Sequence, residues 1–168
     1  MADDANDTQH ASLANGADNE PTIGLITQYV KDLSFENPNS PNVYQWQEQP
    51  QIDIQFNIAA DNVGDDLHEV VLKIVVKAVA PEGTAFAVDL SFGALFGIRN
   101  VPADQIQPFL FAEAPRLVFP FARRVLADAV RDGGFPPLLL DPIDFGALYM
   151  QQAQAVAEQA EAPVVGNA

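Results

Sequence analysis

Apolar and polar residues alternate along much of the first hundred residues, which is the pattern of half-buried β-strands. The clearest segment, residues 51–58, places large apolar side chains at every second position and polar side chains between them. Similar segments at residues 70–76 and 86–92 follow short turns, and residues 23–35 form a looser one. We expect the three later strands to form an antiparallel meander and the first strand to pair at an edge of the same sheet.

From Pro102 onward the apolar residues follow helical spacing instead. Residues 117–129 repeat an apolar side chain every four positions, as one face of a helix requires. The Gly133-Gly134 pair is expected to end this helix, the proline-containing stretch 135–143 to run extended, and Asp144 to cap a final helix. Strands followed by helices predict an α+β fold, with a four-stranded antiparallel sheet and helices packed on one of its faces.

The segment between the first two predicted strands, residues 37–50, is too long for a tight hairpin turn, so it must cross over or loop out. It contains Val43, Tyr44 and Trp46, which are unusually apolar for a loop. These side chains can fill a local core or line an adaptable binding surface, and the pattern alone leaves both interpretations open.

The charge balance narrows the choice of partners. Eight basic residues against 23 acidic ones give a net charge of −15, which repels phosphate backbones and anionic membrane surfaces. Nucleic acid and membrane insertion are therefore poor hypotheses, and a cationic protein surface is a better one. Cysteine is absent, which excludes disulfides, a thiol nucleophile and thiolate zinc clusters.

The two ends of the chain differ in composition from the middle. Residues 1–20 hold five acidic residues, no basic residue and no apolar stretch, so we expect an acidic disordered tail and no signal peptide. Residues 21–152 are expected to form one folded domain, followed by a flexible C-terminal tail over residues 153–168. No apolar run reaches membrane length, and we expect the protein in the cytoplasm.

Catalytic signatures are missing from the sequence. The two histidines, His10 and His68, stand alone, so no metal site is expected. No serine occurs in a nucleophile motif, and neither common glycine-rich phosphate loop is present, so no cofactor is expected. Adjacent Asp65 and Asp66 lie in a glycine-containing turn, where acids are usually solvated. We predict a binding protein and not an enzyme.

Three acidic residues suggest a binding surface. Asp32 and Glu36 lie on one side of the first strand by its period of two, and Asp89 is on the polar face of the fourth strand. If these strands are neighbours, the acids form a patch. The alternative is that they are ordinary solvent-facing strand residues.

Five blocks of sequence, in order and with compatible spacing, resemble the SecB protein-export chaperone family. Together they extend over most of residues 21–152. The blocks are YVKDLSFENPNSPNVYQ (29–45), HEVVLKIVVKAVA (68–80), EGTAFAVDLSFGALFGI (82–98), FPFAR (119–123) and GGFPPLLLDPIDFGALYM (133–150).

The resemblance implies an assembly and a task. The family forms a homotetramer, a dimer of dimers in which sheets join edge to edge and long helices lie between the dimers. It binds unfolded precursors of exported proteins in the cytosol without ATP, keeps them competent for translocation and delivers them to the SecA motor. The implied SecA-binding surface comprises Asp32, Glu36, Ala87 and Asp89, and Ala87 is smaller than the apolar residue that is familiar at its position.

The resemblance also implies a groove for unfolded clients. In the family, this groove is walled by the crossover loop, the second strand, the loop that connects the helices, and the last helix. The corresponding residues here are Val43, Tyr44, Trp46, Ile52, Ile54, Phe56, Leu138, Leu140, Tyr149 and Met150.

Two other classes of function remain as alternatives. An acidic adaptor or scaffold would bind one folded basic partner through Asp32, Glu36 and Asp89 and would ignore unfolded chains. A small carboxylate-dependent enzyme would need a closed pocket containing a titrating acid, and no residue in the sequence is singled out for that role.

Overall fold

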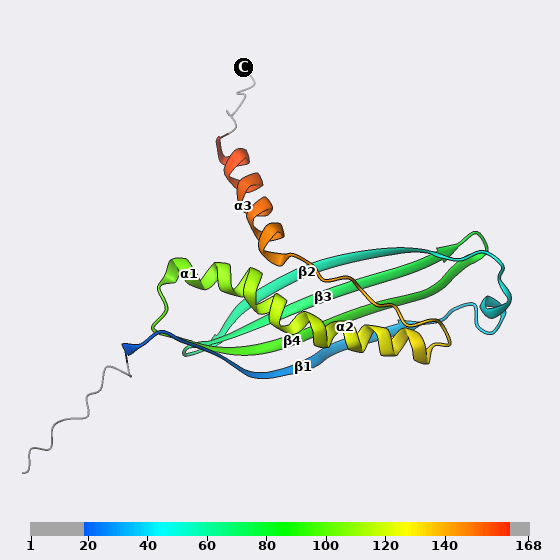
Figure 1. Cartoon of the computed structure of the whole chain (residues 1–168), viewed down its shortest axis with the longest axis horizontal. Coiled ribbons are helices and arrows are strands. Elements are labelled where there is room, and N and C mark those ends of the chain that lie inside the picture. The colour runs from blue at the N-terminus through cyan, green and yellow to red at the C-terminus, as the bar shows by residue number, and fades with distance from the viewer. Residues whose placement is uncertain (1–18, 162–168) are drawn as a thin grey trace, which may run out of the picture.

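The computed structural model describes residues 19–161, which form one sheet and a set of helices (Figure 1). The expected α+β class, with a four-stranded antiparallel sheet followed by helices, is confirmed. The strands are β1 (Thr22–Glu36), β2 (Gln51–Gly64), β3 (Leu67–Ala80) and β4 (Gly83–Arg99). The helices are the short 3₁₀ turn η2 (Asn42–Gln45), α1 (Ala103–Pro108), the π-helical turn η3 (Phe109–Glu113), α2 (Ala114–Asp132) and α3 (Phe145–Glu161).

The strand order in the sheet is β1-β4-β3-β2, and all neighbours are antiparallel. The expected meander is therefore β2-β3-β4, and β1 pairs with β4 at the edge as predicted. Because β1 and β2 lie at opposite edges, residues 37–50 have to carry the chain across the full width of the sheet. This explains why that connection is long and contains apolar residues, which lie over the end of the sheet.

Two β-bulges in β1 change which side chains share a face. The pairing with β4 shifts register between Leu25 and Thr27 and again between Val30 and Asp32. Each extra residue reverses the alternation, so Tyr29 lies on the face opposite to Leu25 and Leu33. Strict alternation along residues 23–35 predicts these three side chains on one side of the strand, and for Tyr29 that prediction is wrong. Asp32 and Glu36 both follow the second bulge, in an unbroken register with β4, so they share a face as predicted.

The hydrophobic core lies on one face of the sheet, which we call the helix face. Alternate residues of β3 and β4, including Leu72, Ile74, Leu90 and Phe96, are at most 1% exposed there, and α2 packs across them. Burying such side chains contributes about 1.5–3 kcal/mol each. The opposite face, which we call the open face, carries the polar alternation.

The helical region between the sheet and the final connection forms one run, from Ala103 to Asp132. It begins well before the helical repeat recognised over residues 117–129, because α1 and η3 precede α2. Gly133 and Gly134 follow its end as predicted, and Gly134 adopts φ of 86°, which favours glycine.

The final helix α3 is capped as expected, since Asp144 Oδ1 accepts a hydrogen bond from the Ala147 N–H at 2.9 Å. It continues to Glu161 and so includes the first part of the segment expected as a flexible tail. Figure 1 shows α3 projecting beyond the β2 edge of the sheet. Most of the expected N-terminal tail and residues 162–168 lie outside the described residues.

No helix within residues 19–161 combines the length and the hydropathy needed to cross a bilayer.

Candidate functional site: two surfaces on opposite faces of the sheet

The largely apolar surface near the β2 edge is hollowed in two places. The first hollow, which we call the crossover hollow, has a volume of about 390 Å³ and lies between the start of β2 and the chain after α2. Its apolar lining consists of Ile52, Phe86, Phe135, Pro136, Pro137 and Leu138. Gln49 and Pro50 complete its rim. Aromatic and proline side chains give this hollow an apolar surface with few hydrogen-bonding groups.

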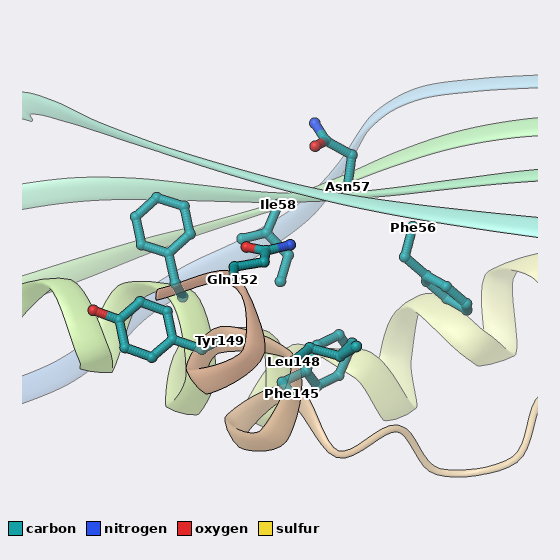
Figure 2. Close-up of a pocket in the computed structure, with 8 residues that line it drawn as sticks. Phe56, Asn57, Ile58, Phe145, Leu148, Tyr149 and Gln152 are labelled. Atoms are coloured by element: carbon teal, nitrogen blue, oxygen red, sulfur yellow. The ribbon is translucent and has the colours of Figure 1, made fainter. Parts of the chain in front are cut away.

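The second hollow, the α3 hollow, lies between β2 and α3 and has a volume of about 110 Å³ (Figure 2). Phe56 and Ile58 of β2 lie toward Leu148 and Tyr149 of α3, whereas Asn57 points to the other face of the strand. Tyr149 and Gln152 also line an adjoining, more open hollow of about 410 Å³, which reaches Val156. The apolar surface therefore follows α3 away from the sheet.

Four of the ten predicted groove residues line these hollows. Ile52 and Leu138 line the crossover hollow, and Phe56 and Tyr149 line the α3 hollow. Ile54 is half-buried between Ile52 and Phe56 on the helix face of β2, so β2 connects the two hollows.

The three apolar loop residues differ in how deeply they are buried. Tyr44 is 51% exposed, and its ring lies 5.7 Å from the ring of Phe135, which lines the crossover hollow. Val43 is only 6% exposed and belongs to the core, which favours the core-filling interpretation for that residue. Trp46 is half-buried against the core.

Six of the ten predicted groove residues line none of these hollows: Val43, Tyr44, Trp46, Ile54, Leu140 and Met150. Leu140 is 7% exposed and packs into the core, and its carbonyl accepts a hydrogen bond from Arg123 Nη1 at 3.2 Å. Met150 is 63% exposed on α3. Leu139, between the predicted Leu138 and Leu140, is 72% exposed.

Several residues that line the hollows were not predicted from the sequence. Phe135, Pro136 and Pro137 directly precede the predicted Leu138, and the two prolines already indicated an extended, partly exposed segment. On α3, the spacing of Tyr149, Gln152 and Val156 at i, i+3 and i+7 marks one helical face and could have been found.

The predicted acidic residues do come together, on the open face. Asp32, Glu36, Ala87 and Asp89 all line one shallow depression of about 280 Å³. The register explains this, because Glu36 pairs with Ala87 and Ser34 with Asp89. We call this group of four residues the acidic surface.

The acidic surface is bordered by cations that the sequence analysis did not assign to it. Lys77 lines the same depression, and Lys73 forms an ion pair with Asp89 at 3.4 Å. Among the ion pairs of residues 19–161, none involves Asp32 or Glu36. Within the described residues, only Asp89 of the three carboxylates is therefore in an ion pair.

Next to the acidic surface, Tyr29, Lys31 and Glu69 form a polar cluster on the open face. Lys31 Nζ lies 2.9 and 2.8 Å from the two carboxylate oxygens of Glu69, and the Tyr29 hydroxyl donates to Glu69 Oε1 at 2.6 Å. Both hydrogen bonds lower the pKa of Glu69. The bond from Lys31 has the larger effect and the bond from Tyr29 the smaller one. The hydrogen bond to Glu69, followed by burial and the Glu69 charge, raises the pKa of Tyr29 to about 12. Lys31 is thus paired with Glu69.

Comparison with known proteins identifies the family. The family model described as preprotein translocase subunit SecB matches residues 16–156. The protein-export protein SecB of Sphingopyxis alaskensis is 64% identical over 92% of this chain and 91% of its own length. That of Novosphingobium aromaticivorans is 54% identical over the full length of both chains.

A solved structure supports the fold independently. A SecB-like chaperone of Mycobacterium tuberculosis, in complex with a ChAD peptide from the HigA1 antitoxin, superposes with a TM-score of 0.61 at 15% identity, over 72% of this chain and 90% of that one. At such low identity the likeness concerns the fold alone. The match of the family model and of the close relatives, over nearly all of the chain, shows that this protein belongs to the SecB family of protein-export chaperones.

Proposed function

We propose that this protein binds unfolded precursors of exported proteins in the cytoplasm, without ATP, and delivers them to the SecA motor of the translocase. The observation that carries the proposal is the apolar surface that β2 connects from the crossover hollow to the α3 hollow. Unfolded chains expose apolar segments that folded proteins hide, and burying them contributes about 25 cal/mol per Å².

The lining suits clients of many sequences. Phe, Pro and Leu side chains offer shape and apolar area but few directional hydrogen bonds, so they do not select one sequence. The chain also lacks the glycine-rich loops that bind nucleotide phosphates, which agrees with capture that needs no ATP. Client folding then competes with capture, so slowly folding precursors are bound preferentially.

We further propose that four copies assemble as a dimer of dimers. The β1 strand is an open edge of the sheet, and its apolar residues Ile23, Leu25, Ile26, Val30 and Leu33 are all 42–57% exposed. On α2, Leu117 and Phe121 are also more than 40% exposed. Exposed edge strands and large apolar patches of this kind are normally covered in assemblies. Several grooves on one tetramer would raise the effective concentration for a long client.

For delivery, we propose that the acidic surface contacts a basic part of SecA. Asp32 and Glu36 supply charge without ion-pair partners in the described chain, whereas Asp89 is already held by Lys73. The two sites lie on opposite faces of the sheet, so a client and SecA can be bound together.

The competing function is an acidic adaptor that binds one folded basic partner through the same acids. Calorimetry with one exported precursor, prepared both unfolded and folded, separates the two. Binding of the unfolded form alone supports the chaperone function, and its loss in Ile54→Asp and Tyr149→Asp variants supports the groove. Binding of a single folded partner, with no affinity for unfolded chains, supports the adaptor.

A further inference from the structure

A polar contact joins two segments that are distant in sequence, close to Phe135 of the crossover hollow. The Tyr44 hydroxyl donates to the Gly133 carbonyl at 2.7 Å, and Asn37 Nδ2 donates to the same carbonyl at 3.1 Å. Asn37 Nδ2 also donates to the Tyr44 hydroxyl oxygen at 2.8 Å. An amide nitrogen has two hydrogens, and a hydroxyl both donates and accepts, so all three bonds can form at once.

The contact uses a group that the end of a helix leaves free. The last carbonyls of a helix have no partner within it, and Gly133 directly follows α2. Its carbonyl therefore accepts from side chains of the crossover connection. We name these three residues, Asn37, Tyr44 and Gly133, the latch.

Packing around the latch requires the glycine. A Cβ on Gly133 would clash with the Phe35 ring, so no larger residue fits there without movement of that ring. Phe35 stacks on Phe86 with ring centroids 6.2 Å apart, and Phe86 lies 4.8 Å from Phe135. Since Phe135 in turn contacts the Tyr44 ring, a series of four aromatic rings connects the latch with Phe86 and Phe135, which line the crossover hollow.

We propose that Asn37 and Tyr44 are positioning residues, which hold the crossover connection against the chain after α2 and so keep the crossover hollow in its binding shape. This inference rests on the proposed client-binding function. It identifies the residues that hold the crossover hollow in shape before a client binds. A site that is ordered before binding loses less conformational entropy when the client binds. Release of the latch therefore weakens client binding at the crossover hollow and leaves the α3 hollow unaffected.

Because the chain contains no cysteine, a single introduced thiol can report client binding at each hollow separately. Gln49 on the rim of the crossover hollow and Gln152 at the α3 hollow are both exposed. Two single-cysteine variants are made, Gln49→Cys and Gln152→Cys. Protection of that thiol from alkylation, titrated with an unfolded, cysteine-free precursor segment, gives the Kd at each position. These two proteins, with the latch intact, are measured first. No protection in either would contradict the proposed client binding itself.

The latch is then removed with Asn37→Ala combined with Tyr44→Phe, which keeps the ring against Phe135. All three hydrogen bonds of the latch are then lost, and we expect the Kd at position 49 to rise roughly five- to thirtyfold. The Kd at position 152 should stay within twofold. The control is Gln47→Ala, whose side chain bonds only to the Gln45 carbonyl of the same loop.

A second readout follows the loop without a client. Trp46 is the only tryptophan, and it lies in the crossover connection. We expect its emission to shift to the red and its quenching by acrylamide to increase when the latch is removed. If the double variant does not fold, Tyr44→Phe alone provides the same comparison. An unchanged Kd at position 49, or equal losses at both positions, would overturn the proposal.

Discussion

At the scale of single residues, a glycine in the sheet interior decides whether Tyr29 can lie flat on the open face. A Cβ at Gly93 would lie 2.5 Å from the Tyr29 ring, whereas one at Gly97 would meet Ile26 at an ordinary 3.5 Å. We expect Gly93→Ala to lower the free energy of unfolding by about 1–3 kcal/mol through overpacking. Chemical denaturation measures this, and the matched Gly97→Ala should change stability far less. An equal effect of both would contradict the packing argument.

The cluster around Tyr29 also predicts a pH dependence. A raised tyrosine pKa means that the folded state favours the neutral hydroxyl, so its stabilisation is complete below pH 10 and is lost as the pH rises toward about 12. Glu69 has a lowered pKa, so its contribution is present above pH 4.5 and is lost on further acidification. We expect Tyr29→Phe to remove the alkaline part of this dependence. Unfolding midpoints measured across pH test it, and an unaltered alkaline profile would count against the cluster.

At the scale of secondary-structure elements, the position of α3 depends on its first turn. Asp144 caps the helix, and replacement of such a cap by alanine costs about 1 kcal/mol. We expect Asp144→Ala to reduce helicity and to weaken protection of a thiol at position 152, because Leu148 and Tyr149 are then held less firmly. Circular dichroism and the alkylation assay measure both. Asp141→Ala, an exposed acid in the same connection, is the control and should leave both unchanged.

The elements also show what the sequence could predict. The alternation in residues 51–58 predicts the sheet, and periodicity alone places Asp32 and Glu36 on one side of their strand. That Asp89 lies beside them depends on the pairing of β1 with β4, which the sequence left as a condition. The reversed orientation of Tyr29 could not, because it depends on two bulges that are defined by pairing with β4. The latch and the lining by Phe135 depend on contacts between segments that only the folded chain brings together.

At the scale of the whole molecule, the open β1 edge predicts the assembly. Leu33 is 42% exposed on the helix face of β1, and an aspartate there would place a charge in an apolar contact between copies. We expect Leu33→Asp to convert tetramers into smaller species in sedimentation velocity experiments. Thr27→Asp puts the same charge on the open face of the same strand and serves as the control. Tetramers that persist in Leu33→Asp would contradict the proposed role of β1.

The strand order has a further consequence for how the chain folds. The hairpins β2-β3 and β3-β4 join residues that are close in sequence, as in the pairing of Val79 with Thr84. Pairing of β1 with β4 joins Thr27 to Leu95, and closing such a long loop costs more entropy before any contact forms. The meander should therefore form first, leaving β4 with an unpaired edge until β1 arrives. During synthesis β1 emerges before its partner exists, so this chaperone must itself pass through a state that exposes an open sheet edge.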